Sequence, residues 1–460
     1  MRILLLSPPY VPEFMRNGRC DYVSISHTQW YPIWLSYCGA LLEKLGHRVK
    51  LIDAPSEGLS HEEAFTRAVD FAPNILVVYS STKSKENDIF FAGKLKDRLN
   101  NYVVFVGPYV SAEPDTYINK FNNIDAIVKG EFDYPISELA NEVERGKIKN
   151  LVWKKEGVCI TNDAAEPLTR EKLDEIPFVT EFYNRHLNVK NYRVPSELYP
   201  FVDIFTGRGC FWGRCTFCLW PQSLAKGPVY NTRSIDNVTD ELKFVKKRMS
   251  YVKEVFFQDD TLPQWRIVEL CEAFLSNKLE LVWSCYVRAD LDSQTLRLMK
   301  ESGCLALHVG YETVNNSVLK SIRKGLTSER MTEFTKDAKK AGLHIHGDFL
   351  IGLPGETESS IKKTIAWARK LNPETAQFLP ISLYPGTELY ESLAREGWIK
   401  DGEPDYSDLP REKLHRLSRR GYREFYLNRN SVKKIITHPY FYFFSRKKSI
   451  YKFIVSFFKS

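Results

Sequence analysis

The run Gly207-Arg-Gly-Cys-Phe-Trp-Gly-Arg-Cys-Thr-Phe-Cys-Leu-Trp-Pro221 contains three cysteines, Cys210, Cys215 and Cys218, within nine residues. A short cysteine cluster in an intracellular chain binds metal more often than it forms disulfides. Zinc sites and ordinary iron–sulfur clusters take four ligands, and no His or Cys lies between Cys218 and Cys271. Three thiolates therefore favour an iron–sulfur cluster with one open iron, ahead of zinc and ahead of three buried structural cysteines.

The composition indicates a globular protein, since 43% of the 460 residues are hydrophobic and 27% are charged. A chain of this length predicts roughly two to four domains. Nine cysteines, an odd number, argue against a disulfide framework. The apolar start at residues 2–9 is too short for a signal peptide, and no segment approaches the roughly 18 apolar residues of a membrane span. We therefore expect a cytoplasmic, reduced protein, which suits an oxygen-sensitive cluster.

Residues 1–150 alternate apolar strands with amphipathic helices. Strands are expected at 2–7, 48–54, 74–79, 103–106 and 125–129, and helices at 34–45, 62–71 and 90–99. This alternation predicts an α/β domain with a doubly wound parallel sheet. Ligands bind at the carboxyl ends of such strands, where the loops begin at Ser7, Asp53, Ser80, Gly107 and Gly130.

Residues 151–200 are interpreted as a linker with a small hairpin, and the strand–helix alternation resumes over residues 201–400. Strands are expected at 201–205, 254–258, 281–286, 305–310, 344–351 and 375–381. Polar residues follow these strands, as they do at the active-site end of a βα barrel. The sequence therefore predicts a partial barrel of the TIM type. Cys285, outside the cysteine run, is the one other cysteine expected to point into it.

The cysteine run resembles the signature of radical S-adenosylmethionine (SAM) enzymes. The usual family spacing is three residues and then two, whereas here it is four and then two, with the extra residue within 211–214. The resemblance implies that Cys210, Cys215 and Cys218 hold a [4Fe–4S] cluster whose fourth iron binds SAM. It also implies cleavage of SAM to a 5′-deoxyadenosyl radical and a reductant such as ferredoxin or flavodoxin.

The same resemblance implies roles for residues beyond the predicted strand ends. Asp259 and Asp260 are suited to accept hydrogen bonds from SAM or a polyol, with helix capping as the alternative. Arg288 is suited to a bidentate carboxylate contact, with a surface salt bridge as the alternative, and Glu312 to the ribose hydroxyls. The stretch from Gly347 through Ile351 and Gly352 resembles the strand beside adenine, where glycines permit close approach of the backbone. Together with Cys285, the two aspartates are the candidate catalytic residues.

The order of the domains resembles the radical SAM subclass with an N-terminal cobalamin-binding domain. The matching residues are Ser7, Pro8, Gly107, Gly130, Glu131 and, in the barrel, Tyr384 of Tyr384-Pro-Gly-Thr387. The Asp-x-His-x-x-Gly motif of cobalt ligation is absent, and Val106-Gly-Pro-Tyr109 replaces the usual Gly-Gly-Pro-His. Cobalamin bound without a protein histidine is one reading, and a domain that serves only as scaffold is the other.

Residues 401–460 form a C-terminal region that carries the charge imbalance. Residues 425–460 contain eight Lys or Arg and no Asp or Glu, which equals the net charge of +8. The balanced remainder offers no case for nucleic-acid binding. Ile450, Phe453, Ile454, Phe457 and Phe458 fall on one helical face. We expect a basic, aromatic helical tail in peripheral contact with the inner face of a membrane, with packing of this helix on the barrel as the alternative.

The run Cys215-Thr-Phe-Cys-Leu-Trp-Pro-Gln222 resembles the cluster loop of enzymes that build cyclopentane polyols on isoprenoid lipids, the hopanoid cyclitol-ether and archaeal calditol synthases. The resemblance implies radical rearrangement of a sugar-like lipid headgroup into a carbocycle. Two alternatives stand beside this hypothesis. The first is cobalamin-dependent radical C-methylation, and the second is a non-enzymatic carrier of cobalamin or an iron–sulfur cluster.

Overall fold

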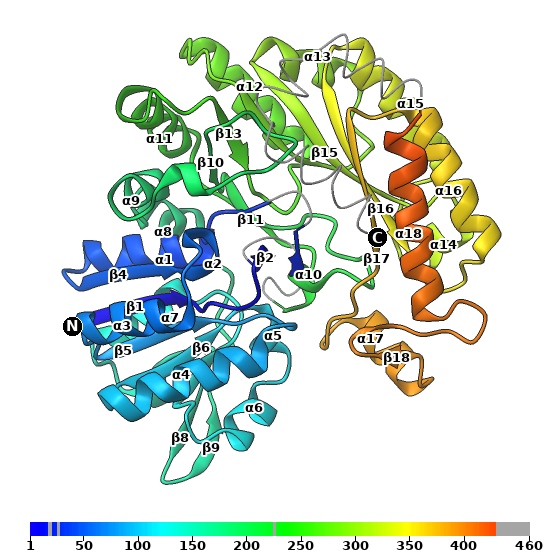
Figure 1. Ribbon diagram of the computed structural model, residues 1–460. Helices are drawn as coiled ribbons and strands as arrows, with labels where there is room; N and C mark the ends of the chain where they lie inside the picture. Colours follow the sequence, from blue (N-terminus) through cyan, green and yellow to red (C-terminus); the bar gives the residue numbers. More distant parts are fainter. Residues whose placement is uncertain (17–20, 25–27, 224–226, 429–460) are drawn as a thin grey trace.

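Two mainly parallel sheets, each covered by helices, form the body of the protein (Figure 1). The computed structural model describes residues 1–16, 21–24, 28–223 and 227–428. The predicted α/β class, with a doubly wound parallel sheet followed by a partial βα barrel, is confirmed. The tail predicted to contact a membrane, residues 429–460, lies outside the described residues. Within the described residues, no helix has the length and apolar character needed to cross a bilayer.

The first sheet has seven strands in the order β4-β1-β5-β6-β7-β8-β9. Its parallel strands are β4 (Arg48–Asp53), β1 (Arg2–Ser7), β5 (Ile75–Tyr79), β6 (Tyr102–Val106) and β7 (Ala126–Val128). All five predicted strands are present, each within one residue of its expected bounds. The hairpin of β8 (Leu151–Lys155) and β9 (Val158–Thr161) pairs antiparallel with β7. The sheet therefore continues into the region expected to be a linker.

Alternation along β1 explains why helices cover both faces of this sheet. Ile3 and Leu5 belong to one buried cluster, whereas Leu4 and Leu6 belong to another. Successive side chains of a strand point to opposite faces, so a continuous apolar strand needs cover on both. The helices and short turns of this part of the chain are α1 (Ile33–Lys44), α2 (Ala54–Glu57), α3 (His61–Phe71), α4 (Lys85–Leu99), α5 (Pro108–Ala112), α6 (Pro114–Lys120), α7 (Asp133–Ala140), η1 (Arg145–Lys147), α8 (Arg170–Glu175), α9 (Val179–His186) and η2 (Val189–Asn191).

The second sheet is the open barrel, with six strands in the order β10-β13-β14-β15-β16-β17. They are β10 (Phe201–Ile204), β13 (Glu254–Phe257), β14 (Trp283–Val287), β15 (Cys304–Glu312), β16 (His344–Ile351) and β17 (Thr375–Pro380), and all pair in parallel. The six predicted strands are all present. The short pairs outside the two sheets are β2 (Phe14–Met15) with β3 (Tyr22–Val23), β11 (Gly207–Gly209) with β12 (Tyr230–Thr232), and β18 (Ile399–Lys400) with β19 (Glu403–Pro404).

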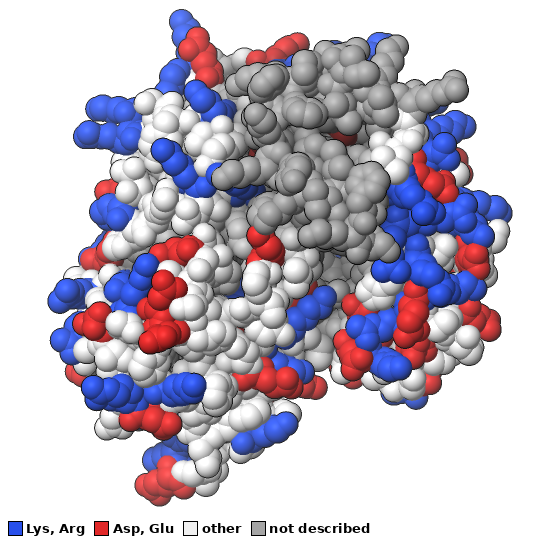
Figure 2. Space-filling view, viewed as in Figure 1, with Lys and Arg blue, Asp and Glu red and all other residues white. Residues whose placement is uncertain are grey.

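Helices line the outer side of the barrel in chain order (Figure 1). They are α11 (Ile235–Arg248), α12 (Gln264–Ser276), α13 (Ser293–Glu301), α14 (Asn316–Ser321), α15 (Ser328–Lys340), α16 (Glu358–Leu371) and α18 (Arg411–Tyr426), with α10 (Leu219–Ser223) and α17 (Glu388–Arg395) near the cysteine run. Helix α18 packs on the last strand, where the Ser418 hydroxyl donates to the Phe378 carbonyl at 2.6 Å. On the face in Figure 2, basic side chains gather in the region where α18 lies, whereas both signs are mixed over the first sheet.

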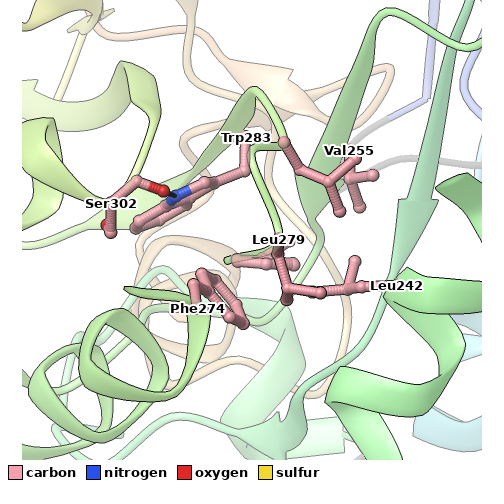
Figure 3. A pocket seen from close by; sticks show the side chains of 8 residues that line it. Leu242, Val255, Phe274, Leu279, Trp283 and Ser302 are labelled. Atoms are coloured by element: carbon pink, nitrogen blue, oxygen red, sulfur yellow. Dashed lines mark hydrogen bonds between the residues drawn. The ribbon is translucent and has the colours of Figure 1, made fainter. Parts of the chain in front are cut away.

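A small void in the barrel core lies between α11, α12 and the sheet (Figure 3). Its volume is about 10 Å³, and the side chains around it are mainly apolar, among them Leu242, Phe274 and Trp283. A cavity must reach about 10–15 Å³ to hold one water molecule, which also needs polar partners. This cavity is therefore a packing defect and no binding site.

Candidate functional site

The three cysteines lie on one loop between β11 and α10, and each is partly exposed. The Gly213 N–H lies 3.3 Å from the Cys210 sulfur. The side-chain amide of Gln222 donates to the carbonyls of Cys215, Thr216 and Cys218 at 3.1, 3.2 and 2.8 Å. One side chain thus fixes the backbone that carries two of the cysteines.

The loop suits a cluster better than a single metal ion. Within the described ranges, no three His, Cys, Asp or Glu side chains converge as ligands of one ion. A cubane does not require such convergence, because each cysteine binds a different iron. The partly exposed thiols and the glycine-bearing turn of the loop therefore fit the predicted [4Fe–4S] cluster.

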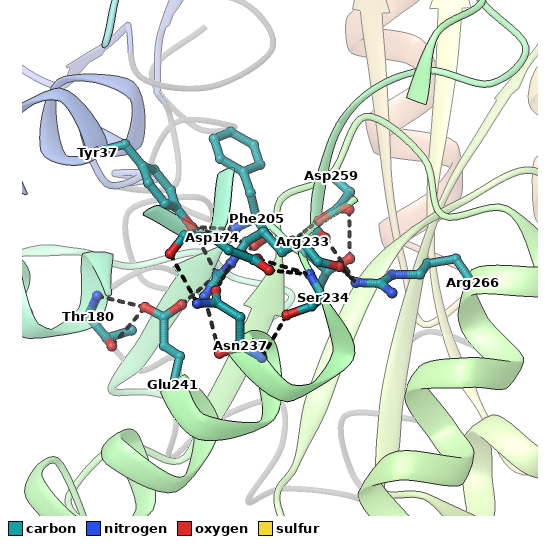
Figure 4. Close-up of polar contacts among 11 residues, drawn as sticks. Tyr37, Asp174, Thr180, Phe205, Arg233, Ser234, Asn237, Glu241, Asp259 and Arg266 are labelled. Atoms are coloured by element: carbon teal, nitrogen blue, oxygen red, sulfur yellow. Dashed lines mark hydrogen bonds and ion pairs between the residues drawn. The ribbon is translucent and has the colours of Figure 1, made fainter. Parts of the chain in front are cut away.

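Asp259 belongs to a buried polar network around the chain that precedes the cysteine loop (Figure 4). It is fully buried and accepts hydrogen bonds from the backbone and hydroxyl of Thr206 at 2.7 and 2.8 Å and from the Tyr230 hydroxyl at 2.6 Å. These contacts hold the strand that leads into the loop, and the predicted catalytic role of Asp259 stays a prediction. Helix α12 begins at Gln264 with Pro263 at its N-cap, so the capping alternative is wrong for Asp259 and Asp260. A catalytic role for the partly buried Asp260 stays a prediction.

A second buried network continues from Asp259 toward the linker region. The Arg233 guanidinium donates to Glu241 at 2.6 Å and to the Phe205 carbonyl at 2.9 Å, and Arg266 donates to the Arg233 carbonyl at 2.7 Å (Figure 4). Buried charges persist where they are paired and hydrogen-bonded. The residues before the cysteine loop are therefore held by a rigid polar frame.

A charged cluster flanks Cys215 at the carboxyl ends of β14 and β15. The Lys324 ammonium lies 2.7 Å from the Glu312 carboxylate, and the Arg288 guanidinium donates to the Lys324 carbonyl at 3.0 Å. Arg288 also lies 4.3 Å from the centroid of the Trp212 ring. Burial raises the pKa of the Cys215 thiol, while Lys324 and Arg288 act to lower it. The structure thus brings the predicted residues Arg288 and Glu312 beside the cysteine loop.

Sequence reasoning missed Lys324, Trp212 and Gln222. Arg288 is buried against Trp212 and the Lys324 backbone, so it is not a surface residue. The salt bridge expected as the alternative is nevertheless present, with Asp290 at 3.1 Å. The stretch Ile322-Arg-Lys-Gly325 could have indicated Lys324 as a site residue, because a glycine follows two adjacent cations directly after a short helix. Gly325 has a φ of +70°, and an added Cβ would lie 2.2 Å from the Trp212 ring.

The glycine-containing turn after β16 is held by Glu356. Its carboxylate accepts from the backbone N–H groups of Gly352 and Leu353 at 3.0 and 3.1 Å and from the Thr313 hydroxyl at 2.9 Å. Gly352 has a φ of +92°, and an added Cβ would lie 2.8 Å from Leu414. Glu356 therefore connects the turn at Gly352 with the chain that follows Glu312, another contact that the sequence did not reveal.

The other two residues predicted beside adenine lie within β16. Ile351 is fully buried, and an added Cβ at Gly347 would meet the rings of Phe349 and Tyr311 at 3.1 and 3.3 Å. Tyr311 packs on Trp367 of α16, so the missing side chain of Gly347 faces the helical layer.

Cys285 lies on the same side of β14 as Trp283, which packs against Phe274 of α12. The side chain is fully buried, and burial raises the pKa of its thiol. The expectation that Cys285 points into the barrel is therefore wrong, because it faces the helical layer. The inward face of β14 carries Tyr286, which packs on His308 at 5.2 Å.

The carboxyl edge of the first sheet meets the cysteine loop. The Ser223 hydroxyl donates to the Pro108 carbonyl at 3.0 Å, one residue after Gly107. The Arg208 guanidinium lies 2.6 Å from Asp133 and 3.3 Å from Glu131. The loop after β7, with Gly130 and Glu131, is thereby tied to the strand that precedes Cys210.

The other residues predicted at this edge lie in the same junction. The Pro8 carbonyl accepts from Arg16 at 2.7 Å, and the Tyr384 hydroxyl lies 3.4 Å from Asp21. Ser7 is fully buried, and its hydroxyl has no hydrogen-bond partner among the described residues. Gly107 has a φ of +112°, and an added Cβ would lie 2.9 Å from the Ser80 carbonyl. An unsatisfied hydroxyl beside a glycine-bearing edge fits a bound group rich in amides, as cobalamin is.

This chain is similar to known proteins over most of its length. A protein-family model described as "Radical SAM superfamily" matches residues 204–368 of this chain. An uncharacterised methyltransferase of Pyrococcus horikoshii is 30% identical over 458 residues, which cover 95% of each chain. The cytidylyl-2-hydroxyethylphosphonate methyltransferase of Streptomyces wedmorensis is 26% identical over 91% of this chain and 84% of its own length.

A solved structure shares the fold. The radical SAM methyltransferase TsrM of Kitasatospora setae, with cobalamin and a [4Fe–4S] cluster bound, has a TM-score of 0.65 at 17% identity, covering 86% of this chain and 78% of its own. The predicted cofactor class, SAM with a [4Fe–4S] cluster, is confirmed at the level of the family. With its cysteine loop, its partial barrel and a relative similar over nearly its whole length, this chain belongs to the radical SAM superfamily.

Proposed function

We propose that this chain is a cobalamin-dependent radical SAM methyltransferase that adds a methyl group to a carbon atom of its substrate. The observation that carries the proposal is the contact between the carboxyl edge of the first sheet and the cysteine loop, through Ser223 with Pro108 and through Arg208 with Glu131. A methyl donor held at that edge would lie near the cysteine loop, where SAM would bind. The names of two relatives and of a solved neighbour, all methyltransferases, support this reading.

Different residues on the cluster side of the site would hold the irons and SAM. Cys210, Cys215 and Cys218 would hold three irons, and the cluster with SAM supplies the radical chemistry when bound. Arg288 and Glu312 stand beside Cys215 and are suited to the carboxylate and ribose of SAM. The Lys324 ammonium lies 2.7 Å from the Glu312 carboxylate and holds this side chain in place.

The cobalamin side would use backbone and small side chains. Ser7, Pro8, Gly107 and Gly130 line the carboxyl edge, and no histidine occurs in residues 107–110. Cobalamin held here supplies the methyl group. Glu131 has a positioning role, because it holds Arg208 at the base of the cysteine loop.

Carbocycle formation on a lipid is the competing reaction class. The predicted contact of the C-terminal tail with a membrane would support that class. One experiment separates methylation from carbocycle formation. Extracts and lipids of a host strain are compared by mass spectrometry with those of a strain lacking the gene, after growth on methionine with a deuterated methyl group. Methylation predicts that the deletion strain accumulates the unmethylated species, and that the missing product is the same species with one hydrogen replaced by a deuterated methyl group. A missing species without that mass difference and label would overturn methylation in favour of rearrangement.

The cobalamin part has a direct binding test. Anaerobically purified protein is mixed with hydroxocobalamin, and the cobalamin retained after gel filtration is measured by absorbance. Ser7→Ala removes the unsatisfied hydroxyl, so we expect binding weaker by about three- to tenfold, the value of one hydrogen bond. Ser276→Ala on the exposed end of α12 is the matched control. Absence of cobalamin binding by the unaltered protein would contradict the proposal.

A further inference from the structure

The outer side of the cysteine loop is a surface of the molecule. Phe211 is 36% exposed, and Arg214 is exposed beside it. A surface pocket of about 260 Å³ opens directly at Cys215. Its lining comprises Gly213, Arg214, Cys215, Thr216, Gln222, Arg323 and Glu388. A cluster ligand therefore borders on a concave, solvent-facing surface.

The charges around this pocket are mainly positive. Arg214, Lys320 and Arg323 are exposed, and Arg323 follows Lys320 by one turn, with its N–H 3.0 Å from the Lys320 carbonyl. Glu388 neutralises Arg323 in a two-pronged pair at 2.7 and 2.8 Å. Within the described part of the chain, no salt bridge neutralises Arg214 or Lys320. Two cations are thus left for an incoming partner.

The surface beside the pocket also has the composition of a contact site. Phe211 and Trp212 present aromatic surface, and Arg214 lies 5.4 Å from the centroid of the Trp212 ring. Aromatic residues and arginine are enriched at the residues that dominate protein–protein binding. The Trp212 indole donates to the Arg323 carbonyl at 2.9 Å, which joins the loop to the cationic turn. The patch is therefore one connected surface and not two separate loops.

We propose that this patch, formed by Phe211, Arg214, Lys320 and Arg323, docks a small acidic protein that carries one electron. A cluster at the three cysteines accepts its electron from outside the chain, and Cys215 is the ligand that borders the pocket. Acidic carriers complement the two unpaired cations, which steer such a partner by electrostatic attraction. The carrier loses one electron and the cluster gains it, with no bond formed or broken. This inference rests on the cluster and is independent of cobalamin and of the substrate.

Binding of purified flavodoxin and of purified ferredoxin, both oxidised, tests the proposal without any turnover. Each carrier is titrated against the protein by isothermal calorimetry at low and at high salt. The variant Arg214→Glu with Lys320→Glu is expected to bind at least one carrier about tenfold more weakly at low salt, and salt is expected to weaken binding by the unaltered protein. The variant Lys247→Glu with Arg248→Glu on α11, far from this loop in Figure 1, reverses the same number of exposed charges and is the control.

A second measurement separates docking from damage to the site. SAM cleavage driven by titanium(III) citrate is expected to be unchanged in Arg214→Glu with Lys320→Glu, whereas cleavage driven by the reduced carrier falls. Phe211→Ser is expected to weaken carrier binding without removing its salt dependence. The proposal is overturned if neither carrier binds the unaltered protein, or if the control variant loses as much affinity as the patch variant.

Discussion

The two parallel sheets carry different chemistry at the same kind of edge. The carboxyl end of the barrel holds the cysteine loop and the ion pair of Glu312 with Lys324. The carboxyl end of the first sheet holds Ser7, Gly107 and other small residues, with an unsatisfied buried hydroxyl at Ser7. Strand ends of a parallel sheet gather loops in both cases, so the loops alone decide the chemistry. Charge and thiols suit a cluster and SAM, whereas hydroxyls and bare backbone suit a large polar cofactor.

Removing Arg208 breaks the connection between these two edges and has the largest expected effect. The guanidinium is buried and pairs with the buried Asp133 at 2.6 Å. Arg208→Met leaves that carboxylate buried without its partner, which is expected to lower the free energy of unfolding by about 3–5 kcal/mol. Urea denaturation measures the loss. Arg208→Met with Asp133→Asn should recover part of it, and a loss below about 1 kcal/mol for the single variant would contradict the account.

Glu356 makes the barrel edge sensitive to pH. Burial raises the pKa of its carboxyl to about 7 from the ordinary 4.5. Between these values the folded chain binds more protons than the unfolded chain, so this contribution to stability is present at low pH and is lost as pH rises through about 7. The unfolding free energy of the unaltered protein should therefore fall between about pH 5 and pH 8. In Glu356→Gln this fall should be smaller, by up to about 3 kcal/mol.

The matched control for this profile is Glu358→Gln. Hydrogen bonds and charges of Lys362 and Lys413 lower the pKa of Glu358 to about 2. Its contribution to stability is thus present above its ordinary pKa and is lost only at lower pH, outside the window of Glu356. Equal profiles for the unaltered protein and Glu356→Gln would show that the turn at Gly352 does not depend on this carboxyl.

Gln222 holds the backbone of the cysteine loop, so replacing it tests how firmly the cluster ligands are positioned. Its amide holds three carbonyls of the cysteine loop, so Gln222→Leu frees the backbone around Cys215 and Cys218. Residues that orient metal ligands affect metal affinity by about 10–100-fold. We expect iron to be removed by a chelator correspondingly more readily, as measured by iron content after reconstitution, and we expect no change in Gln294→Leu on the exposed side of α13. Iron retention like that of the unaltered protein would show that the loop holds its shape without Gln222.

The smallest effect belongs to Glu388, which pairs with Arg323 on the surface, where both side chains are more than half exposed. Exposed ion pairs contribute about 0–1 kcal/mol. Glu388→Gln is therefore expected to change the melting temperature little. The same change frees Arg323, so it should strengthen binding of an acidic carrier, which calorimetry measures. Weaker carrier binding would contradict the positive character assigned to this surface.

Much of the fold was predictable from local pattern, because apolar strands and polar strand ends are visible in the sequence. The positions of Arg288 and Glu312 after predicted strands followed from the same pattern, whereas the cysteine spacing was read directly from the sequence. Contacts between distant segments were not predictable. Trp212 and the Arg323 backbone meet across 111 residues, and nothing near Trp212 signals this contact. The orientation of Cys285 was missed because a continuously apolar strand does not show which of its faces is inward.

The measurement closest to the central claim is electron paramagnetic resonance of anaerobically reconstituted, reduced protein, recorded with and without SAM. Three cysteine ligands leave one iron open, so the account predicts a [4Fe–4S] signal that changes when SAM is added. The signal should be absent when Cys210, Cys215 and Cys218 are all replaced by alanine. A cubane signal that SAM leaves unaltered, or one that survives the triple replacement, would contradict the account.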